Sequence, residues 1–380
     1  MKKRVDSGEN PDGRVTLADI ATRSGFSKAT VSYALNGREG VSERARTEIL
    51  ELAKSLGYVR RGPRRDFDSR QDRKIGVVIS RTEPDGSLNY YITSLLAGFE
   101  EHCRQAGIAL EVATWEGWST YGSIRDGAIS GFAYLGGSFT TDILAGAPEP
   151  SVLIGTDCPG WAYDTVLADN RRGAYLATKH LLEQGRLRLG MINGPRTTRT
   201  SESKWAGFQD ALAEFATASE VGTEVGEFSF ESGYEAVKRF FTGKRESPNG
   251  LFVADDPMAL GACRALSDLG IAVPQEVAVV GFGNSPAGAI ARPTISTVEV
   301  FKSHLGSIGA SLLLDRLDGV PAPHQLILVA PSLVVRESSA VPGEETGNLR
   351  SIRQGEKGID LVNAAASRVI SPLESAGQDD

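Results

Sequence analysis

The stretch VTLADIATRSGFSKATVSYALNG, residues 15–37, decides the fold of the N-terminal part of the chain. Thr16 is followed three residues later by Asp19, which is the spacing of a helix-capping box. Gly25 supplies the residue type that most readily ends a helix in a left-handed conformation. Ser27 is then placed to cap a second helix. We therefore predict two short helices joined by a tight turn.

The second helix has one face to pack and one face left free. Ala21, Gly25 and Val31 would let the two helices approach, turn and pack on each other, and Ser42 is placed to cap a third helix. The free face carries residues that suit a helix lying in a DNA major groove: Lys28, Ala29, Ser32, Tyr33 and Asn36. This spacing alone also fits an ordinary three-helix bundle whose polar face meets water.

The rest of the chain divides by composition into further segments. Residues 1–13 read as a disordered leader, 14–59 as the helix-turn-helix domain and 60–73 as a charged linker. Short apolar runs alternate with amphipathic segments over 74–338, which predicts a doubly wound parallel sheet in each of two α/β lobes, with a ligand cleft between them. Residues 339–380 read as a disordered tail, although 359–370 fit one short helix.

The individual elements of the α/β part follow from the same alternation. Strands are predicted at 75–79, 108–113, 131–135, 151–154, 188–192, 250–253 and 277–282. Helices are predicted in the segment through Leu95 and Cys103 and at 171–184, 203–215, 232–242 and 257–269.

The charge of the chain is unevenly distributed, which points to a polyanion as the partner of one end. Residues 1–74 hold 17 Lys and Arg against 11 Asp and Glu, whereas residues 75–380 hold 24 against 37. The three cysteines form no CxxC motif or Cys/His cluster, so neither a disulfide framework nor a metal site is predicted. No secretion signal or membrane-spanning stretch is apparent, and we expect a cytoplasmic, nucleoid-associated protein without a membrane partner.

The sequence resembles the LacI/GalR family of transcription regulators. The resemblance is carried by residues 15–37, VSERAR at 41–46 and LGY at 56–58. It continues to about residue 338 through IGVVIS at 75, LATKHLLEQG at 176, VADDPMALGACRAL at 253, VPQEVAVVGFGNSP at 273 and RPTISTV at 292. It implies a helix-turn-helix head, a periplasmic-binding-protein-like effector domain and a homodimer that binds a pseudo-palindromic operator.

The resemblance also implies which residues contact operator DNA. Contacts to base edges or close to them are expected from Lys28, Ala29, Ser32 and Tyr33, and contacts to phosphates from Thr16, Ser27, Thr30, Asn36 and Ser42. The family usually has Arg where this chain has Tyr33, and a tyrosine offers one hydroxyl in place of a bidentate guanidinium. We therefore expect an unusual operator half-site.

The linker departs from the family pattern more strongly. Relatives carry a Pro-Asn pair where this chain has Arg60 and Arg61, and a leucine wedge where it has Phe67. Pro63 falls inside the segment, so a hinge helix would begin near it. Phe67 is predicted to insert between base steps in the minor groove. The alternative is a flexible basic tether without ordered insertion.

Positions that match the family's effector contacts are substituted in ways that put a standard hexose in doubt. Sugar-binding relatives commonly have Arg, Asn and Asp where this chain has Lys204, Asp255 and Gly283, respectively. Trp161 is expected at the mouth of the cleft, where an indole can stack on a flat ligand, or else packs on the surface of a lobe. The complete predicted set for a small polar, sugar-like effector is Asn89, Tyr90, Tyr91, Trp161, Lys204, Asp255 and Gly283.

Enzymatic readings have little support in the sequence. Asp256 precedes Pro257, so a helix cap accounts for this carboxylate, and no catalytic, phosphate-binding or dinucleotide motif occurs. We predict no catalytic residue, no cofactor and no metal. The function indicated is an allosteric DNA-binding repressor. The competing class is a solute-binding protein or a sugar-modifying enzyme with an incidental helical head.

Overall fold

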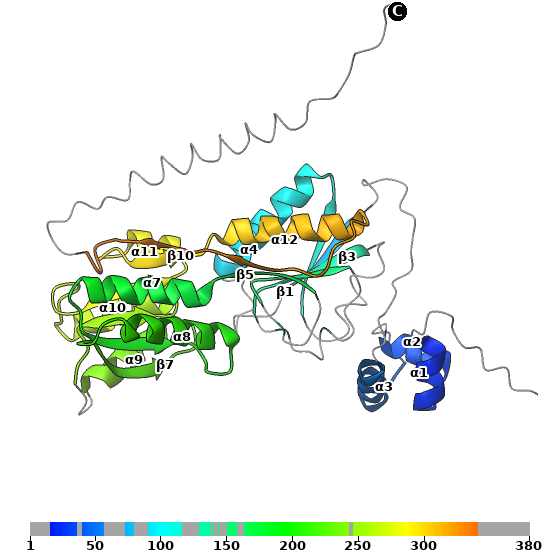
Figure 1. Ribbon diagram of the computed structural model, residues 1–380, viewed down its shortest axis with the longest axis horizontal. Coiled ribbons are helices and arrows are strands. Elements are labelled where there is room, and N and C mark those ends of the chain that lie inside the picture. Colours follow the sequence, from blue (N-terminus) through cyan, green and yellow to red (C-terminus); the bar gives the residue numbers. More distant parts are fainter. Residues whose placement is uncertain are drawn as a thin grey trace, which may run out of the picture. The chain divides into compact units, whose positions relative to one another are not determined.

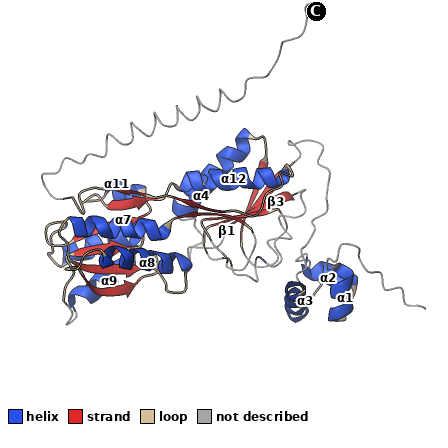
Figure 2. Ribbon diagram, in the orientation of Figure 1, coloured by secondary structure: helices blue, strands red, loops and turns tan. Residues whose placement is uncertain are grey.

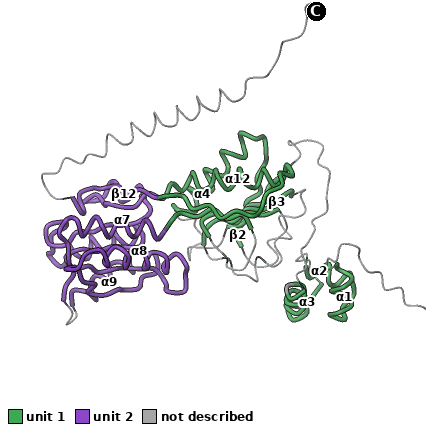
Figure 3. The backbone as a smooth tube through the Cα atoms, in the orientation of Figure 1, with its two compact units in different colours: residues 1–169, 300–330 green, residues 170–299, 331–380 purple. Residues whose placement is uncertain are grey.

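The computed structural model describes residues 16–35, 40–56, 73–79, 90–115, 129–137, 139, 144, 150–156, 158, 163–242 and 246–340. Apart from the three helices of the head, the described chain divides into two α/β units, coloured separately in Figure 3. The chain leaves the first unit after Asp169, returns to it at Val300 and leaves it again after Ala330.

Three capped helices form the head: α1 (Leu17–Ser24), α2 (Lys28–Leu35) and α3 (Glu43–Ser55). The capping box is present, because the Asp19 amide donates to Thr16 Oγ1 and the Thr16 amide donates to Asp19 Oδ2 at 2.7 Å. Gly25 ends α1 with φ of 73°, in the left-handed region. Ser27 and Ser42 accept from the amides three residues on, as predicted. The core joins the three helices through Ile20, Val31, Ala34, Leu35, Ile49 and Ala53.

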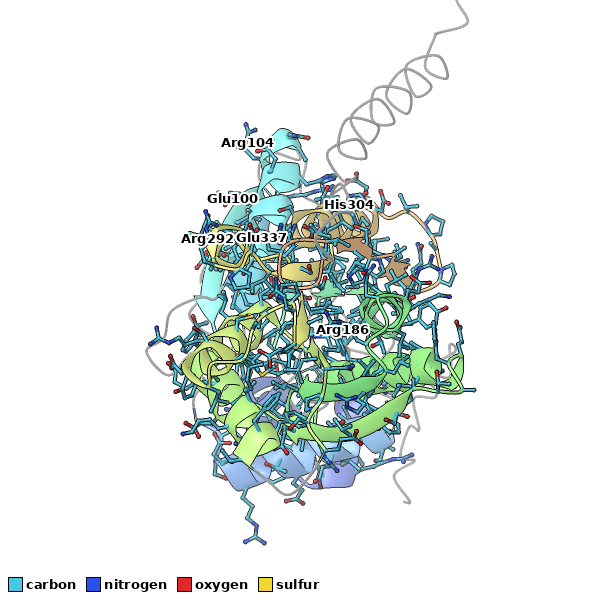
Figure 4. The ribbon with its side chains drawn as sticks, turned by 90° about the vertical axis from the view of Figure 1, so that its left-hand side faces the viewer. Glu100, Arg104, Arg186, Arg292, His304 and Glu337 are labelled. Atoms are coloured by element: carbon cyan, nitrogen blue, oxygen red, sulfur yellow. The ribbon has the colours of Figure 1, made fainter. Side chains whose placement is uncertain are left out.

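The first α/β unit contains a parallel six-stranded sheet in the order β11-β5-β4-β3-β1-β2. The strands are β1 (Lys74–Ile79), β2 (Ala109–Thr114), β3 (Ile129–Leu135), β4 (Ser151–Ile154), β5 (Asp164–Ala168) and β11 (Leu326–Val329). Helices α4 (Tyr90–Gln105) and α12 (Lys302–Leu317) pack together at glycines, since a Cβ on Gly98 would lie 1.8 Å from the Ser303 carbonyl oxygen. Figure 1 labels β1, β3 and β5 of the sheet and helices α4 and α12 of the same unit. Glu100 and Arg104 lie on the exposed face of α4 (Figure 4).

The second unit has a six-stranded sheet in the order β12-β10-β9-β8-β6-β7, and among these strand pairs only β10 with β12 is antiparallel. Figure 2 draws the strands in red and the helices in blue. Its strands are β6 (Arg188–Asn193), β7 (Ser219–Val225), β8 (Gly250–Val253), β9 (Ala278–Phe282), β10 (Ser296–Glu299) and β12 (Ser332–Val334). Its helices are α7 (Asn170–Glu183), α8 (Arg199–Ala213), α9 (Phe230–Thr242), α10 (Asp256–Asp268) and α11 (Pro286–Ile290).

Two pairs of helices in the second unit cross at a glycine. On α8, a Cβ at Gly207 would lie 1.9 Å from the carbonyl oxygen of Arg171 on α7. On α10, a Cβ at Gly261 would lie 1.9 Å from the carbonyl oxygen of Phe230 on α9. Because the neighbouring atom is backbone in both cases, a larger side chain would force the helices apart.

The sequence predicted the fold class correctly and missed several elements. Strands β5, β7, β10, β11 and β12 and helices α11 and α12 were not among the predictions. Helix α12 buries seven of its sixteen residues, three of which are glycine or alanine, so the contrast between its apolar and polar faces is weak in the sequence. Helix α8 begins at Arg199 rather than 203, because the Thr198 hydroxyl caps it by accepting from the Ser201 amide at 3.2 Å.

Candidate nucleic-acid interface and effector site

One face of α2 is accessible and the other is buried. Lys28, Ala29 and Tyr33 are exposed and Ser32 is half-buried, with Tyr33 retaining 41% of its surface. The opposite face packs Val31, Ala34 and Leu35 into the head core. The free face therefore carries the four described residues that the sequence singled out for base contacts. Asn36 lies outside the described residues.

The N-terminus of α2 is suited to an anion. Ser27 accepts from the Thr30 amide at 3.0 Å, and the two hydroxyls lie 2.8 Å apart. The first turn of α2 carries no acidic side chain. In α1, by contrast, Asp19 occupies the first turn, and its hydrogen bonds from Thr16 hold the pKa of that carboxyl below its usual value. No carboxylate in the first turn of α2 therefore offsets the positive end of its dipole, which leaves that end able to bind an anion.

In the first α/β unit, two tyrosines begin α4, where the chain follows the carboxyl end of β1. Tyr90 is exposed, and Lys302 Nζ lies 5.0 Å from the centre of its ring. Tyr91 lies against Gly155, which follows β4, because a Cβ on this glycine would lie 2.6 Å from the Tyr91 hydroxyl. Burial raises the pKa of Tyr91 to about 12. Asn89 and Trp161 lie outside the described residues.

In the second unit, Lys204 places a buried amine at the carboxyl edge of the sheet. Only 5% of the residue is exposed, and its Nζ donates to the Ala254 carbonyl at 2.8 Å. The amine lies 4.0 Å from the ring centre of Phe282 and 6.0 Å from that of Phe228. Burial lowers the pKa of Lys204 to about 8, although nearby Asp255 favours the charged form.

The backbone beside Lys204 is held in an uncommon conformation at Phe228. Its φ is 58°, in the left-handed region that non-glycine residues seldom adopt. The Phe228 ring covers Gly194, because a Cβ there would lie 2.0 Å from the ring. Such strained residues gather at ligand sites more often than elsewhere. A buried amine with a shifted pKa beside Phe228 makes this edge the stronger candidate for ligand binding.

Two sequence profiles match the chain. The profile of the lacI family of bacterial regulatory proteins matches residues 16–61, and that of the periplasmic binding protein-like domain matches residues 178–339. The chain carries a lacI-family DNA-binding domain and a periplasmic-binding-protein-like domain. These matches confirm the resemblance seen in the sequence, the fold class and the functional class of a DNA-binding transcription regulator.

Relatives with known names extend over most of the chain. The HTH-type transcriptional repressor PurR of Haemophilus influenzae (strain PittEE) is 27% identical over 336 residues, which cover 85% of this chain and 98% of the relative. The ribose operon repressor of Haemophilus influenzae (strain ATCC 51907 / DSM 11121 / KW20 / Rd) is 26% identical over 331 residues, with the same two coverages. These relatives are named as repressors, not as enzymes.

Solved structures share the fold of this chain. A complex of the transcriptional regulator CelR with cellobiose has a TM-score of 0.66 and 27% identity, and covers 86% of this chain and 100% of its own. A lac repressor dimer bound to operator and the anti-inducer ONPF has a TM-score of 0.63 and 22% identity, with the same two coverages. The second likeness supports the fold alone.

One capping assignment from the sequence is wrong. Asp255, not Asp256, caps α10, since its side chain accepts from the Met258 amide at 2.8 Å. Asp256 is buried and accepts from the Thr297 hydroxyl at 2.6 Å and from the Ser285 amide. Adjacent carboxylates are thus used in two different ways. Sequence spacing could not separate them, because the partners of Asp256 come from distant strands and loops.

Gly283 occupies a position that its backbone reserves for glycine. Its φ is 118°, and a Cβ there would meet nothing closer than Asp256 Oδ2 at 3.9 Å. The space for a side chain is therefore present, but the backbone conformation strains any residue other than glycine. The aspartate common in sugar-binding relatives would need a different local backbone at this point.

Sequence reasoning missed three residues that the structure places beside the predicted effector contacts. Phe228 and Phe282 flank the Lys204 amine, and buried Lys302 lies beside Tyr90. Phe282 ends a strand that the sequence predicted, which could have drawn attention to it. Phe228 follows a strand that was not predicted. In the described part of the chain, no group of three potential metal ligands occurs, and no helix is long and apolar enough to cross a membrane.

Proposed function

We propose that this chain is a homodimeric transcription repressor that binds a pseudo-palindromic operator and responds to a small polar effector. The observation that carries the proposal is the capped α2, which exposes Lys28, Ala29 and Tyr33 while its other face is buried. The lacI-family match and the names of the relatives support it. Catalysis forms no part of this role, and its setting is the cytoplasm, at the nucleoid.

The proposed DNA contacts divide into those that distinguish base sequences and those that supply affinity. Side chains on the free face of α2 read base edges in the major groove: Lys28, Ala29, Ser32 and Tyr33. The other predicted contacts bind phosphates, which give affinity but little sequence information: Thr16, Ser27, Thr30, Asn36 and Ser42. Phe67 of the linker segment, 60–73, is the proposed wedge in the minor groove. The amino end of α2 supports this arrangement, since its dipole favours a phosphate there.

The proposed effector contacts are the residues that the sequence singled out, of which Asn89 and Trp161 lie outside the described residues: Asn89, Tyr90, Tyr91, Trp161, Lys204, Asp255 and Gly283. Lys204 supports this proposal most strongly, because an ammonium has three donors and its only hydrogen-bond acceptor among the described residues is the Ala254 carbonyl. An effector oxygen would use a remaining donor. The relative solved with cellobiose is consistent with a sugar-like molecule. The effector then acts by its different affinity for two states of the repressor.

The proposal is tested by gel shift with the full chain and the DNA upstream of its own gene. We expect nanomolar, salt-sensitive binding that requires both halves of a palindrome, and loss of that preference in Tyr33→Ala. Glu48→Gln, an exposed change on α3, is the matched control. Absence of sequence-dependent binding on this DNA and on a random duplex library would overturn the proposal. Thermal-shift screening with sugars and nucleosides then identifies the effector.

A further inference from the structure

A buried arginine of α3 holds the end of α2 that carries Tyr33. Arg46 is 4% exposed, and its Nη1 donates to the Ala34 carbonyl at 2.9 Å and to the Tyr33 carbonyl at 3.4 Å. Both carbonyls belong to the last turn of α2, where the helix itself supplies no amide donors. The guanidinium therefore provides the hydrogen bonds that the helix end lacks.

The same guanidinium places positive charge at the negative end of the α2 dipole. No basic residue of α2 lies in its own last turn, so this charge comes from another helix. The two ends of α2 are thus fixed differently. Ser27 caps the amino end within the local sequence, whereas Arg46, on a different helix, holds the carboxyl end. A helix of eight residues has little stability of its own, so both restraints matter.

We propose that Arg46 is a positioning residue for operator recognition, which sets the place of the Tyr33 side chain through the carbonyls of the last turn. This inference rests on the proposed function. Loss of the guanidinium would let the last turn of α2 fray, and Tyr33 would then lose its fixed position over the bases. Lys28 lies in the first turn, next to the serine cap, and keeps its position. The effect on recognition is therefore confined to one end of the helix.

The test uses full-length protein and a random duplex library. The wild-type chain first selects its operator, and Tyr33→Ala and Lys28→Ala then identify the base positions that depend on each side chain. Arg46→Met is expected to relax selectivity about fivefold at the positions that depend on Tyr33, and less than about twofold at those that depend on Lys28. Arg46→Lys keeps the positive charge but loses the planar guanidinium with its several donors. It is expected to lose less selectivity than Arg46→Met.

Arg44→Met is the matched control, because Arg44 is exposed on the same helix and the substitution also removes one positive charge. It should weaken binding equally for all sequences. Equal relaxation at both ends of α2 in Arg46→Met, or a profile like that of Arg44→Met, would overturn the inference. So would unfolding of the head by both Arg46 variants, measured by circular dichroism, since the arginine would then serve folding alone. If the wild-type chain selects no palindrome, the proposed function itself fails.

Discussion

The candidate DNA-binding face of α2 (the α2 interface) and the sheet edge around Lys204 (the Lys204 edge) differ in the sequence separation of the residues that form them. The caps and the free face of α2 are set by residues within one or two helical turns of one another. Around Lys204, the carbonyl acceptor is 50 residues away, and the two flanking rings come from other loops and strands. A site of the first kind depends on local sequence. A site of the second kind depends on the packing of the whole unit, so the two should respond differently to the same type of damage.

The largest expected effect is on the packing that supports the Lys204 edge. In Gly207→Ala, the added Cβ would lie 1.9 Å from the Arg171 carbonyl oxygen, so α7 and α8 must separate. We expect a loss of about 3 kcal/mol in the free energy of unfolding, at the upper end for overpacking a core. Urea unfolding followed by tryptophan fluorescence measures this loss, and hydrogen exchange should show faster exchange in α7 and α8 but not in α1–α3.

The control for this substitution is Gly288→Ala. Its Cβ would meet its nearest neighbour, Ile295, at 3.4 Å, which is ordinary contact, and its φ is not in the left-handed region. It should therefore change the free energy of unfolding by less than about 1 kcal/mol. If Gly207→Ala is no more destabilising than this control, the close crossing of the two helices does not support the unit as argued.

A smaller effect is expected from replacing Lys204 itself while the helices around it stay packed. Lys204→Met should weaken effector binding at least tenfold, because the amine is lost while the volume is nearly kept. Operator affinity without effector should stay the same. Isothermal titration with the effector found by screening measures the first quantity, and gel shift measures the second. An unchanged effector affinity would remove Lys204 from the site.

The same variant has a signature in the pH dependence of stability. The pKa of Lys204 is lowered from 10.5 to about 8, so between these values the unfolded chain binds more protons than the folded chain. The contribution of Lys204 to the free energy of unfolding must then rise as the pH increases from about 8 to 10.5. The free energy of unfolding of the wild type, minus that of Lys204→Met, should increase between pH 7.5 and pH 9.5 in urea titrations. A flat difference would mean that the amine is not desolvated.

The sequence predicted contacts between residues that are close in the chain and missed contacts between residues that are far apart. Thr16, Gly25, Ser27 and Ser42 were assigned correctly as helix ends, because a cap and the amide or carbonyl that it satisfies are close in sequence. Asp256 was assigned wrongly, because its partners, Ser285 and Thr297, are brought to it only by the folded sheet. Its neighbour Asp255 took the capping role instead.

The missed parts of the structure have the same origin. In the sequence, nothing distinguishes Arg46 from an exposed arginine. Only the packing of α3 on α2 shows that it is buried against two carbonyls. Phe228 has a conformation that no local motif predicted. Strands β5 and β11 pair with each other although about 160 residues separate them, as in the contact of Thr165 with Leu326. Family resemblance indicated which residues to consider as effector contacts, but the geometry of the amine and the rings came from the fold.

The smallest expected effect separates two residues of the α2 interface itself. Tyr33→Ala should lower the ratio of operator to random-DNA affinity about fivefold, because it removes an exposed side chain that we propose reads bases. Ser27→Ala should weaken binding to both DNAs by the same factor, since it loses a helix cap and the proposed phosphate contact, neither of which depends on sequence. Fluorescence anisotropy with the selected operator and a scrambled duplex measures both ratios at one salt concentration. A lower ratio in Ser27→Ala, or an unchanged one in Tyr33→Ala, would exchange the two roles and place discrimination at the amino end of the helix. The carboxyl end, which Arg46 holds, would then contribute affinity only.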